Sequence, residues 1–213
     1  MQLTGKLTGI SRRFGKWPLT AAAAVVVMAA VVGVFVTQLM VRHNFHVVSP
    51  GLVYRSAQMD AAGLTETIQE HGIRSILNLR GVNEDSWYNA ETNTSQRLGV
   101  AHYDFKLSAG NELSDEEMEK ILKTIGDAPK PMLIHCKSGA DRTGLVGALY
   151  LYSLEGKSAE SADHELTVWC GHVPYLFWRD TIAMDRSFWR YVGKHAQRPV
   201  NAAELNTPLV KQD

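Results

Sequence analysis

The sequence predicts an α/β fold in which a central, mainly parallel sheet is flanked by helices and preceded by one N-terminal transmembrane helix. Short apolar segments bounded by turn residues alternate with longer segments that carry helical periodicity and caps, which is the pattern of an α/β domain. Residues 18–41 contain no charged residue and are mostly aliphatic. That length fits the roughly 20 apolar residues that cross a bilayer.

The apolar segment 18–41 is expected to remain as an anchor. The apolar region of a cleaved signal peptide is about 7–15 residues long and ends at small residues, whereas this one is longer and ends in Gln-Leu-Met-Val. The basic segment 1–17 is expected to stay in the cytoplasm, because positive charge flanking a span favours that side. The expected location is therefore the inner membrane, single-pass, with the folded body on the periplasmic side of a bacterial cell.

Charge is unevenly distributed along the chain. The formal net charge is zero, with 22 basic and 22 acidic residues, but four basic residues and no acidic one lie in residues 1–17. The remainder is weakly acidic, which argues against a nucleic-acid partner, since such proteins need a basic face. The two cysteines, Cys136 and Cys170, are too few for a disulfide framework.

The elements of the body follow from local patterns. Residues 42–50 are expected to form a tether, 51–198 the folded domain, and 199–213 a disordered polar tail. Strands are expected at 52–55, 73–79, 100–107 and 131–136. Helices are expected from the cap Asp60 to Gly72, before Leu98, from the capping box Ser114–Glu117 to residue 125, and at 143–156, 158–169 and 184–195.

The segment HCKSGADRTG (135–144) joins an expected buried strand to an expected apolar helix. At such a junction the free N–H groups of the first helical turn and the helix dipole favour an anion. The small residues Ser138, Gly139 and Ala140 allow successive N–H groups to converge, and Arg142 adds a fork that suits two phosphate oxygens. The same positive field favours the thiolate of Cys136, the nucleophilic form of the side chain.

These parts suit phosphoryl transfer without a metal or a cofactor. Cys136 would attack phosphorus, water would hydrolyse the cysteinyl-phosphate, and Arg142 with the loop amides would stabilise the transition state. His135 would orient the loop, and the Thr143 hydroxyl would donate to the departing sulfur. The expected substrate-binding residues form one run, namely Lys137, Ser138, Gly139, Ala140, Asp141 and Arg142.

The same ten residues resemble the signature H-C-x5-R-[ST]-G of the protein tyrosine phosphatase superfamily. The segments VYRSAQ (53–58) and ILNLRG (76–81) resemble bacterial members of its dual-specificity branch, and the likeness spans about residues 51–171. It implies a central sheet with the cysteine loop at its carboxyl edge, and hydrolysis of phosphomonoesters without metal. It also implies a carboxylic acid that protonates the leaving group. Asp104 lies at the family's spacing before the cysteine, whereas Glu112 lies in the loop where such an acid is expected.

Several functions remain open at this point. Lys137 is offset by Asp141, which favours phosphotyrosine, or phosphoserine and phosphothreonine, over a highly charged inositol phosphate. A phospholipid substrate stays possible because of the anchor. The alternatives to a protein phosphatase are a phosphate-binding module without turnover and a sulfur-transfer or arsenate-reducing enzyme. Cys170 and His172 are expected to pack in the core, with a disulfide between Cys170 and oxidised Cys136 as the alternative.

Overall fold

The computed structural model describes residues 17–175 and 179–195, in two compact units formed by residues 1–38 and 39–213. Helix α1 (Trp17–Val41) accounts for the described part of the first unit and continues into the second. Its segment Ala21–Gln38 is long and apolar enough to cross a membrane, and none of that segment is buried within the protein. The expected basic segment, except Trp17, and the expected tail 199–213 lie outside the described residues.

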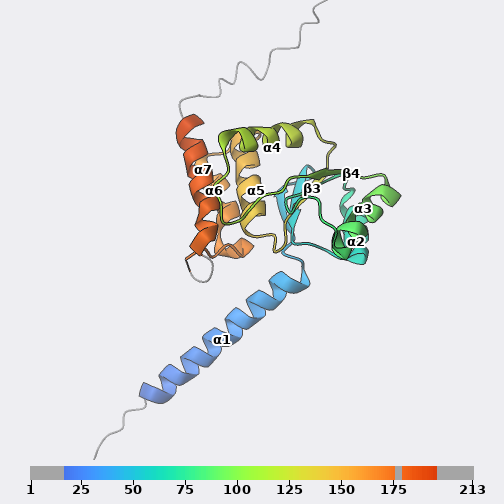
Figure 1. Cartoon of the computed structure of the whole chain (residues 1–213). Coiled ribbons are helices and arrows are strands. Elements are labelled where there is room, and N and C mark those ends of the chain that lie inside the picture. Colours follow the sequence, from blue (N-terminus) through green and yellow to red (C-terminus); the bar gives the residue numbers. More distant parts are fainter. Residues whose placement is uncertain (1–16, 176–178, 196–213) are drawn as a thin grey trace, which may run out of the picture. The chain divides into compact units, whose positions relative to one another are not determined.

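The second unit is built on a five-stranded sheet with the order β1-β2-β5-β3-β4 (Figure 1). β1 pairs antiparallel with β2, and the other neighbouring strands pair in parallel, which confirms the predicted mainly parallel sheet. Parallel strands place their carboxyl ends at one edge, where ligands of α/β proteins bind. The strands are β1 (His46–Ser49), β2 (Val53–Ser56), β3 (Ser75–Asn78), β4 (Ala101–Asp104) and β5 (Met132–His135).

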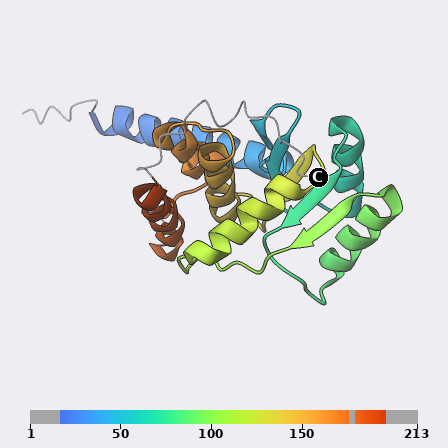
Figure 2. The ribbon, with the colours of Figure 1, turned by 90° about the horizontal axis from the view of Figure 1, so that it is seen from above.

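Helices cover both faces of this sheet (Figure 2). Those of the second unit are α2 (Ala61–His71), α3 (Ser86–Leu98), α4 (Asp115–Asp127), α5 (Asp141–Ser153), α6 (Ala159–Asp163) and α7 (Ile182–His195). Three 3₁₀ turns join the last of them, η1 (His164–Leu166), η2 (Val168–Cys170) and η3 (Arg179–Thr181). The predicted caps are confirmed, since the Asp60 side chain accepts from the Gly63 N–H, and Ser114 and Glu117 form a capping box.

The alternation of strand side chains divides the core into two clusters. On one face Leu77 and Ile134 pack against α4, α5 and α7, whereas on the other Ile76 and Leu133 pack against α2. Successive strand residues point to opposite faces, so a fully buried strand must be apolar on both. Helix α5 is buried along most of its length between the sheet and α7. The residues that precede α5 are thereby held on a rigid support.

Three expected elements differ from the structure. Residues 42–50, expected to be a tether, contain β1, which pairs with β2 at the edge of the sheet. β1 has only four residues, and only the last two are buried. It is therefore too short to show an alternation of apolar and polar residues. The strand expected at 100–107 ends at Asp104. The helix expected at 158–169 breaks into α6, η1 and η2, because Thr167 has extended backbone angles between the two turns.

Candidate active site

The segment that follows β5 lines a cavity of ≈ 530 Å³ at the carboxyl edge of the sheet. Five of the six predicted substrate-binding residues contribute to its wall, while Gly139 does not. The remaining lining residues come from other segments, and one of them, Ala109, belongs to the loop of Glu112 in which the acid was expected. The lining residues are Ala109, Lys137, Ser138, Ala140, Asp141, Arg142, Gly171, Val173 and Thr181.

Arg55, at the end of β2, fixes the second half of this cysteine loop (residues 136–142). Its fully buried guanidinium donates through Nη2 to the carbonyl oxygens of Gly139 (2.6 Å) and Ala140 (3.1 Å). Through Nη1 it donates to the Glu165 carbonyl (2.8 Å) and pairs with the Glu165 carboxylate (2.5 Å). A buried cation needs a counter-charge, so Glu165 of η1 allows Arg55 to stay buried beneath the loop.

The first half of the cysteine loop is held in the same way. The Gln58 N–H donates to the Lys137 carbonyl (3.2 Å), and the Asn44 side-chain amide donates to the Ser138 carbonyl (3.0 Å). Asn44 is buried and has a left-handed φ of 46°, a conformation that asparagine adopts more readily than most residues. Four successive carbonyl groups of the loop therefore point away from the cavity side and toward protein donors.

The four held carbonyl groups determine where the N–H groups point. In a planar trans peptide the C=O and the following N–H lie on opposite sides of the chain. Holding the carbonyls of residues 137–140 therefore turns the N–H groups of Ser138, Gly139, Ala140 and Asp141 in the opposite direction. Within the part of the chain that the structure describes, these four N–H groups donate to no protein acceptor. Convergent N–H groups of this kind form an anion-binding nest.

Gly139 is required by the close packing of the loop on β2. Its φ is +70°, and a Cβ atom there would lie 2.6 Å from the Ala57 nitrogen and from the Ser56 carbonyl carbon. Both of these neighbours are backbone atoms that cannot rotate away. A side chain at this position would therefore displace the loop.

Arg142 lies in the first turn of α5 and lines the cavity. Its Nη1 donates to the carbonyl oxygens of Leu79 (3.3 Å) and Leu107 (3.2 Å), which fixes the plane of the guanidinium. Its Nε is buried and has no partner among the described residues. A buried donor without a partner is costly, and an anion in the cavity would satisfy it.

Cys136 lies at the start of the loop, directly after β5, and is 1 % exposed. The nearby Thr143 hydroxyl is also buried and has no partner among the residues that are described. The amino end of α5 follows the loop, so its dipole adds partial positive charge at the cavity. Cys136 and Cys170 are both free and buried.

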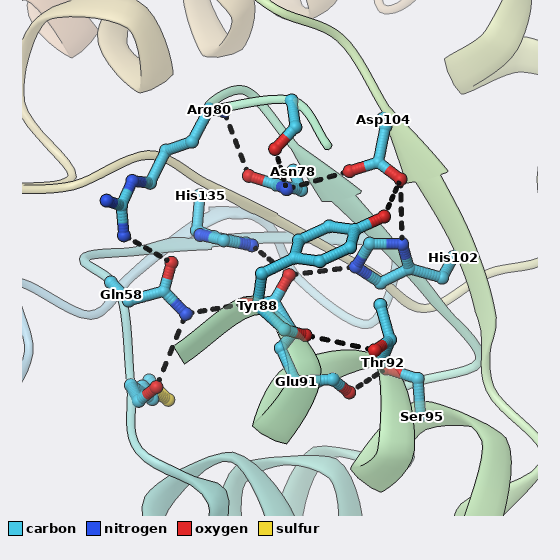
Figure 3. Close-up of polar contacts among 12 residues, drawn as sticks. Gln58, Asn78, Arg80, Tyr88, Glu91, Thr92, Ser95, His102, Asp104 and His135 are labelled. Carbon is cyan, nitrogen blue, oxygen red and sulfur yellow. Dashed lines mark hydrogen bonds and ion pairs between the residues drawn. The ribbon is translucent and has the colours of Figure 1, made fainter. Parts of the chain in front are cut away.

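Glu91 of α3 contacts His135, the residue that precedes the cysteine loop (Figure 3). Its carboxylate accepts from His135 Nε2 (3.0 Å), His102 Nε2 (2.8 Å) and the Gln58 side-chain amide (2.5 Å). Burial alone would raise the pKa of Glu91, but the bonds to His102 and His135 outweigh it and lower that pKa. His135 is thereby oriented by Glu91, which the sequence did not connect with it.

Asp104, predicted as a general acid, ends β4 at the same edge of the sheet as Cys136. Its carboxylate accepts from the Asn78 amide (2.8 Å) and the Tyr88 hydroxyl (2.8 Å), and lies 3.4 Å from His102 Nδ1 (Figure 3). Burial and the bond to Asp104 raise the pKa of Tyr88 to about 12, so this hydroxyl remains a donor. Asp104 is not among the residues that line the cavity.

Glu112, the alternative acid, is also absent from the cavity wall. Its exposed carboxylate forms an ion pair with Arg190 of α7. Asp115 of the α4 amino end pairs with Lys194 and Arg190, so this group of charges joins α4 to α7. Glu112 is therefore held by a surface ion pair.

Arg80 is a second guanidinium close to the site. It stacks on Trp87, 3.5 Å from the ring centre, and donates to the Gln58 side-chain oxygen (3.2 Å). Burial and then the positive charge of Arg142 lower the pKa of Arg80. The segment ILNLRG contains Arg80, but its sequence context alone assigns it no role.

His172, expected to pack in the core, is buried and bridges two acids. Its Nδ1 lies 2.7 Å from Asp141 of the cysteine loop, and its Nε2 lies 2.9 Å from Asp185 of α7. Burial disfavours the imidazolium, but both acids outweigh that effect and raise the pKa of His172 to about 9. Among the described residues, no group of three or more His, Cys, Asp or Glu side chains could hold a metal ion.

The supporting residues that sequence reasoning missed are Asn44, Arg55, Gln58, Glu91 and His172. Arg55 and Gln58 belong to the VYRSAQ segment, so their position in a family-like segment was a usable signal. Asn44 lies in the segment that was expected to be a tether. Glu91 is polar on a mostly polar helix, and only the fold brings it to His135.

Comparison with known proteins supports a phosphatase assignment. The model of the tyrosine phosphatase family matches residues 38–167, more than half of the chain. Among solved structures, TpbA of P. aeruginosa is 25 % identical, with a TM-score of 0.54, and the match covers 67 % of this chain and 83 % of TpbA. A second TpbA structure is a complex with pTyr. It is 22 % identical to this chain with a TM-score of 0.54, and the match covers 70 % of this chain and 90 % of the TpbA chain.

The core catalytic domain of a PP-IP phosphatase from S. cerevisiae shares the fold, with 23 % identity and a TM-score of 0.54. That match covers 73 % of this chain and 94 % of the yeast domain. No protein in the curated set matches the chain. The match of the family model confirms the resemblance carried by residues 135–144, and this chain is a member of the tyrosine phosphatase family.

Proposed function

We propose that this protein hydrolyses phosphomonoesters without a metal ion, through a cysteinyl-phosphate intermediate on Cys136. One observation carries the proposal: four N–H groups of residues 138–141 and the Arg142 Nε have no protein acceptor among the described residues, beside a buried cysteine. Family membership supports a cysteine-based phosphatase. A module that only binds phosphate would need the N–H groups and Arg142, but not the thiol.

The proposed reaction has two steps. In the first, the Cys136 thiolate forms a bond to phosphorus while the bond from phosphorus to the ester oxygen breaks, and that oxygen receives a proton. In the second, water attacks phosphorus, the S–P bond breaks, and inorganic phosphate and the thiolate are released. The N–H groups of the loop and Arg142 stabilise the equatorial oxygens, where charge redistributes. The buried Thr143 hydroxyl donates to sulfur as it leaves.

We propose Asp104 as the source of the proton for the ester oxygen. It lies at the same edge of the sheet as Cys136, in register with Asn78 and through it with His135. Glu112 is held by Arg190 and is the weaker candidate. In the present arrangement Asp104 accepts one bond from Asn78 and one from Tyr88, and a protonated carboxyl group can keep both bonds because each oxygen retains a free lone pair.

The leaving group separates these two acids experimentally. A nitrophenolate leaves without a proton, whereas a serine alkoxide needs one. We expect Asp104→Asn to lower turnover of a phosphoserine peptide about 10²-fold, while hydrolysis of para-nitrophenyl phosphate changes less than about threefold. Glu112→Gln is the matched control and is expected to leave both rates unchanged. The opposite pattern would assign the proton to Glu112.

We propose phosphotyrosine in proteins as the main substrate, with phosphoserine and phosphothreonine as further substrates of a dual-specificity enzyme. Of the charged residues that line the cavity, Asp141 offsets one of the two cations, Lys137 and Arg142. That charge fits a single phosphate better than a highly phosphorylated inositol. The TpbA complex with pTyr supports this choice, whereas the yeast PP-IP phosphatase is the reason to test inositol phosphates as the second candidate.

The experiment is a hydrolysis assay of the full-length protein in detergent with para-nitrophenyl phosphate and a chelator. We expect turnover with the chelator present and none with Cys136→Ser. Cys170→Ser is the matched control because Cys170 is also a buried free cysteine but lies outside the cysteine loop. Binding of a phosphotyrosine peptide without any turnover would identify a phosphate-binding module instead.

We also propose that helix α1 crosses the inner membrane once, with residues 1–17 in the cytoplasm and the phosphatase domain in the periplasm. The uncharged segment and the basic residues before it support this orientation. A reporter enzyme that works only in the periplasm, fused after Asp213, is expected to be active. Activity of a cytoplasm-only reporter at the same position would reverse the topology.

A further inference from the structure

The segment from Val168 to Tyr175 exposes large apolar side chains next to the cavity. Val168 is 48 % exposed, Trp169 69 % and Tyr175 77 %. The same segment lines the cavity through Gly171 and Val173. Val168 and Tyr175 also line a common pocket with Val173, so these exposed apolar residues gather in one place, as they do at interaction surfaces. We call these three exposed residues the apolar rim.

The apolar rim is tied to the place where α1 enters the folded unit. The Asn44 side-chain amide donates to the carbonyl of Cys170 (2.8 Å), the residue after Trp169, and also to the Ser138 carbonyl of the cysteine loop. Asn44 therefore contacts the rim segment and the active site at the same time. The Ala57 N–H, which follows β2, also donates to the carbonyl of His43.

The length of the chain limits the distance between the rim and the membrane. Helix α1 ends at Val41, three residues before Asn44. Three residues span at most about 11 Å even when fully extended. Whatever direction α1 takes, its end must lie within that distance of Asn44, and hence close to both the rim segment and the cysteine loop. Exposed Arg42, between them, can contact lipid phosphates.

We propose that Val168, Trp169 and Tyr175 insert into the interface of the bilayer that α1 crosses, which holds the cavity at the level of the lipid headgroups. Tryptophan and tyrosine are the side chains enriched at this interface, because their rings are apolar and carry one polar group. The docking depends on the proposed membrane span. With the proposed activity, it makes phosphomonoesters carried at the membrane surface the substrates that reach Cys136 most readily.

Quenching of tryptophan fluorescence tests the docking without any activity measurement. The full-length protein is reconstituted into vesicles of phosphatidylcholine and phosphatidylglycerol, with and without brominated acyl chains. We expect Trp169→Phe to lose a quenched component that the wild type shows. Trp189→Phe is the matched control, since Trp189 is exposed on α7, and it should retain that component. Equal quenching in the wild type and Trp169→Phe would overturn the docking.

A second measurement tests the consequence for substrate. In vesicles that contain phosphatidic acid, Trp169→Asp is expected to slow phosphate release from the lipid about fivefold, while soluble para-nitrophenyl phosphate is hydrolysed at the wild-type rate. An equal loss of rate on the lipid and on para-nitrophenyl phosphate would overturn the docking. A loss of rate only on a soluble phosphopeptide would also overturn it and would indicate a protein partner. No hydrolysis of any substrate by the wild type would refute the proposed function, while the quenching result would still decide the docking.

Discussion

Replacing Arg55 by Met tests how the cysteine loop is held. Methionine keeps much of the side-chain length but removes the charge, so the Glu165 carboxylate, 14 % exposed, loses its partner. The Gly139 carbonyl loses its donor as well, whereas the Ala140 carbonyl keeps the N–H of Gly144 as a donor. Breaking a buried ion pair from one side costs roughly 3–5 kcal/mol. Since domains are stable by about 5–15 kcal/mol, this is a large fraction of the total.

The effect on turnover has a different origin from the effect on stability. Without Arg55 the peptide group that carries the Ala140 N–H can rotate, so one of the four donors loses its orientation, whereas the Gly144 N–H still holds the peptide group of Asp141. Removing a single donor to a developing charge costs about 10²–10³-fold in kcat. We therefore expect kcat for para-nitrophenyl phosphate to fall at least about 10²-fold.

The double variant Arg55→Met, Glu165→Met separates the two effects. It removes the uncompensated charge, so the free energy of unfolding is expected to recover by about 1–3 kcal/mol over Arg55→Met. The kcat should stay low, because the Gly139 carbonyl is still not held. Urea unfolding followed by circular dichroism and steady-state kinetics are the two assays. Wild-type kcat in a folded Arg55→Met protein would refute the role assigned to Arg55.

Three further variants test other parts of the site. Gly139→Ala should abolish most activity, because its Cβ would overlap backbone atoms of Ser56 and Ala57. The control is Gly72→Ala, where φ is +63° but the space is open, and it should cost only about 1–2 kcal/mol of stability. Comparable activity of the two variants would contradict this prediction. The raised pKa of His172 means that its stabilisation is complete below pH 6.5 and is lost as the pH rises through about 9. Over that pH range the free energy of unfolding of the wild type should fall by at most about 3 kcal/mol. His172→Gln should therefore make the urea midpoint less dependent on pH. An unchanged pH dependence would contradict the bridge between Asp141 and Asp185. The lowered pKa of Glu91 means that its contribution to stability is lost as the pH falls below the unfolded value of 4.5. Glu91→Gln should therefore make the urea midpoint less sensitive to acid. Equal acid sensitivity in the variant and the wild type would contradict this role of Glu91.

The chemistry-bearing residues of the cysteine loop could be predicted because they are contiguous. Cys136, the small residues after it and Arg142 lie in one ten-residue segment, and a strand before and a helix after can be recognised locally. Asp60 and Ser114 were predictable for the same reason, since a cap and its helix are neighbours in the chain.

The residues that hold this loop could not be predicted, because their partners lie far away in the sequence. Arg55 reaches Gly139 only because β2 and β5 are neighbours in the sheet. Local hydrophobic periodicity does not predict the order of the strands. Glu91 reaches His135 across 44 positions. Asn44 precedes the edge strand β1, which is too short to show an alternating pattern of apolar and polar residues. Its position beside the sheet could therefore not be predicted.

The most direct test of the account is to identify the phosphorylated residue during turnover. The full-length protein is mixed with para-nitrophenyl phosphate, quenched with acid and digested, and the phosphorylated peptide is sequenced by mass spectrometry. We expect phosphate on the sulfur of Cys136, and none on Cys170 or on any residue of Cys136→Ser. Continued hydrolysis by Cys136→Ser, or turnover without phosphate on Cys136, would contradict it.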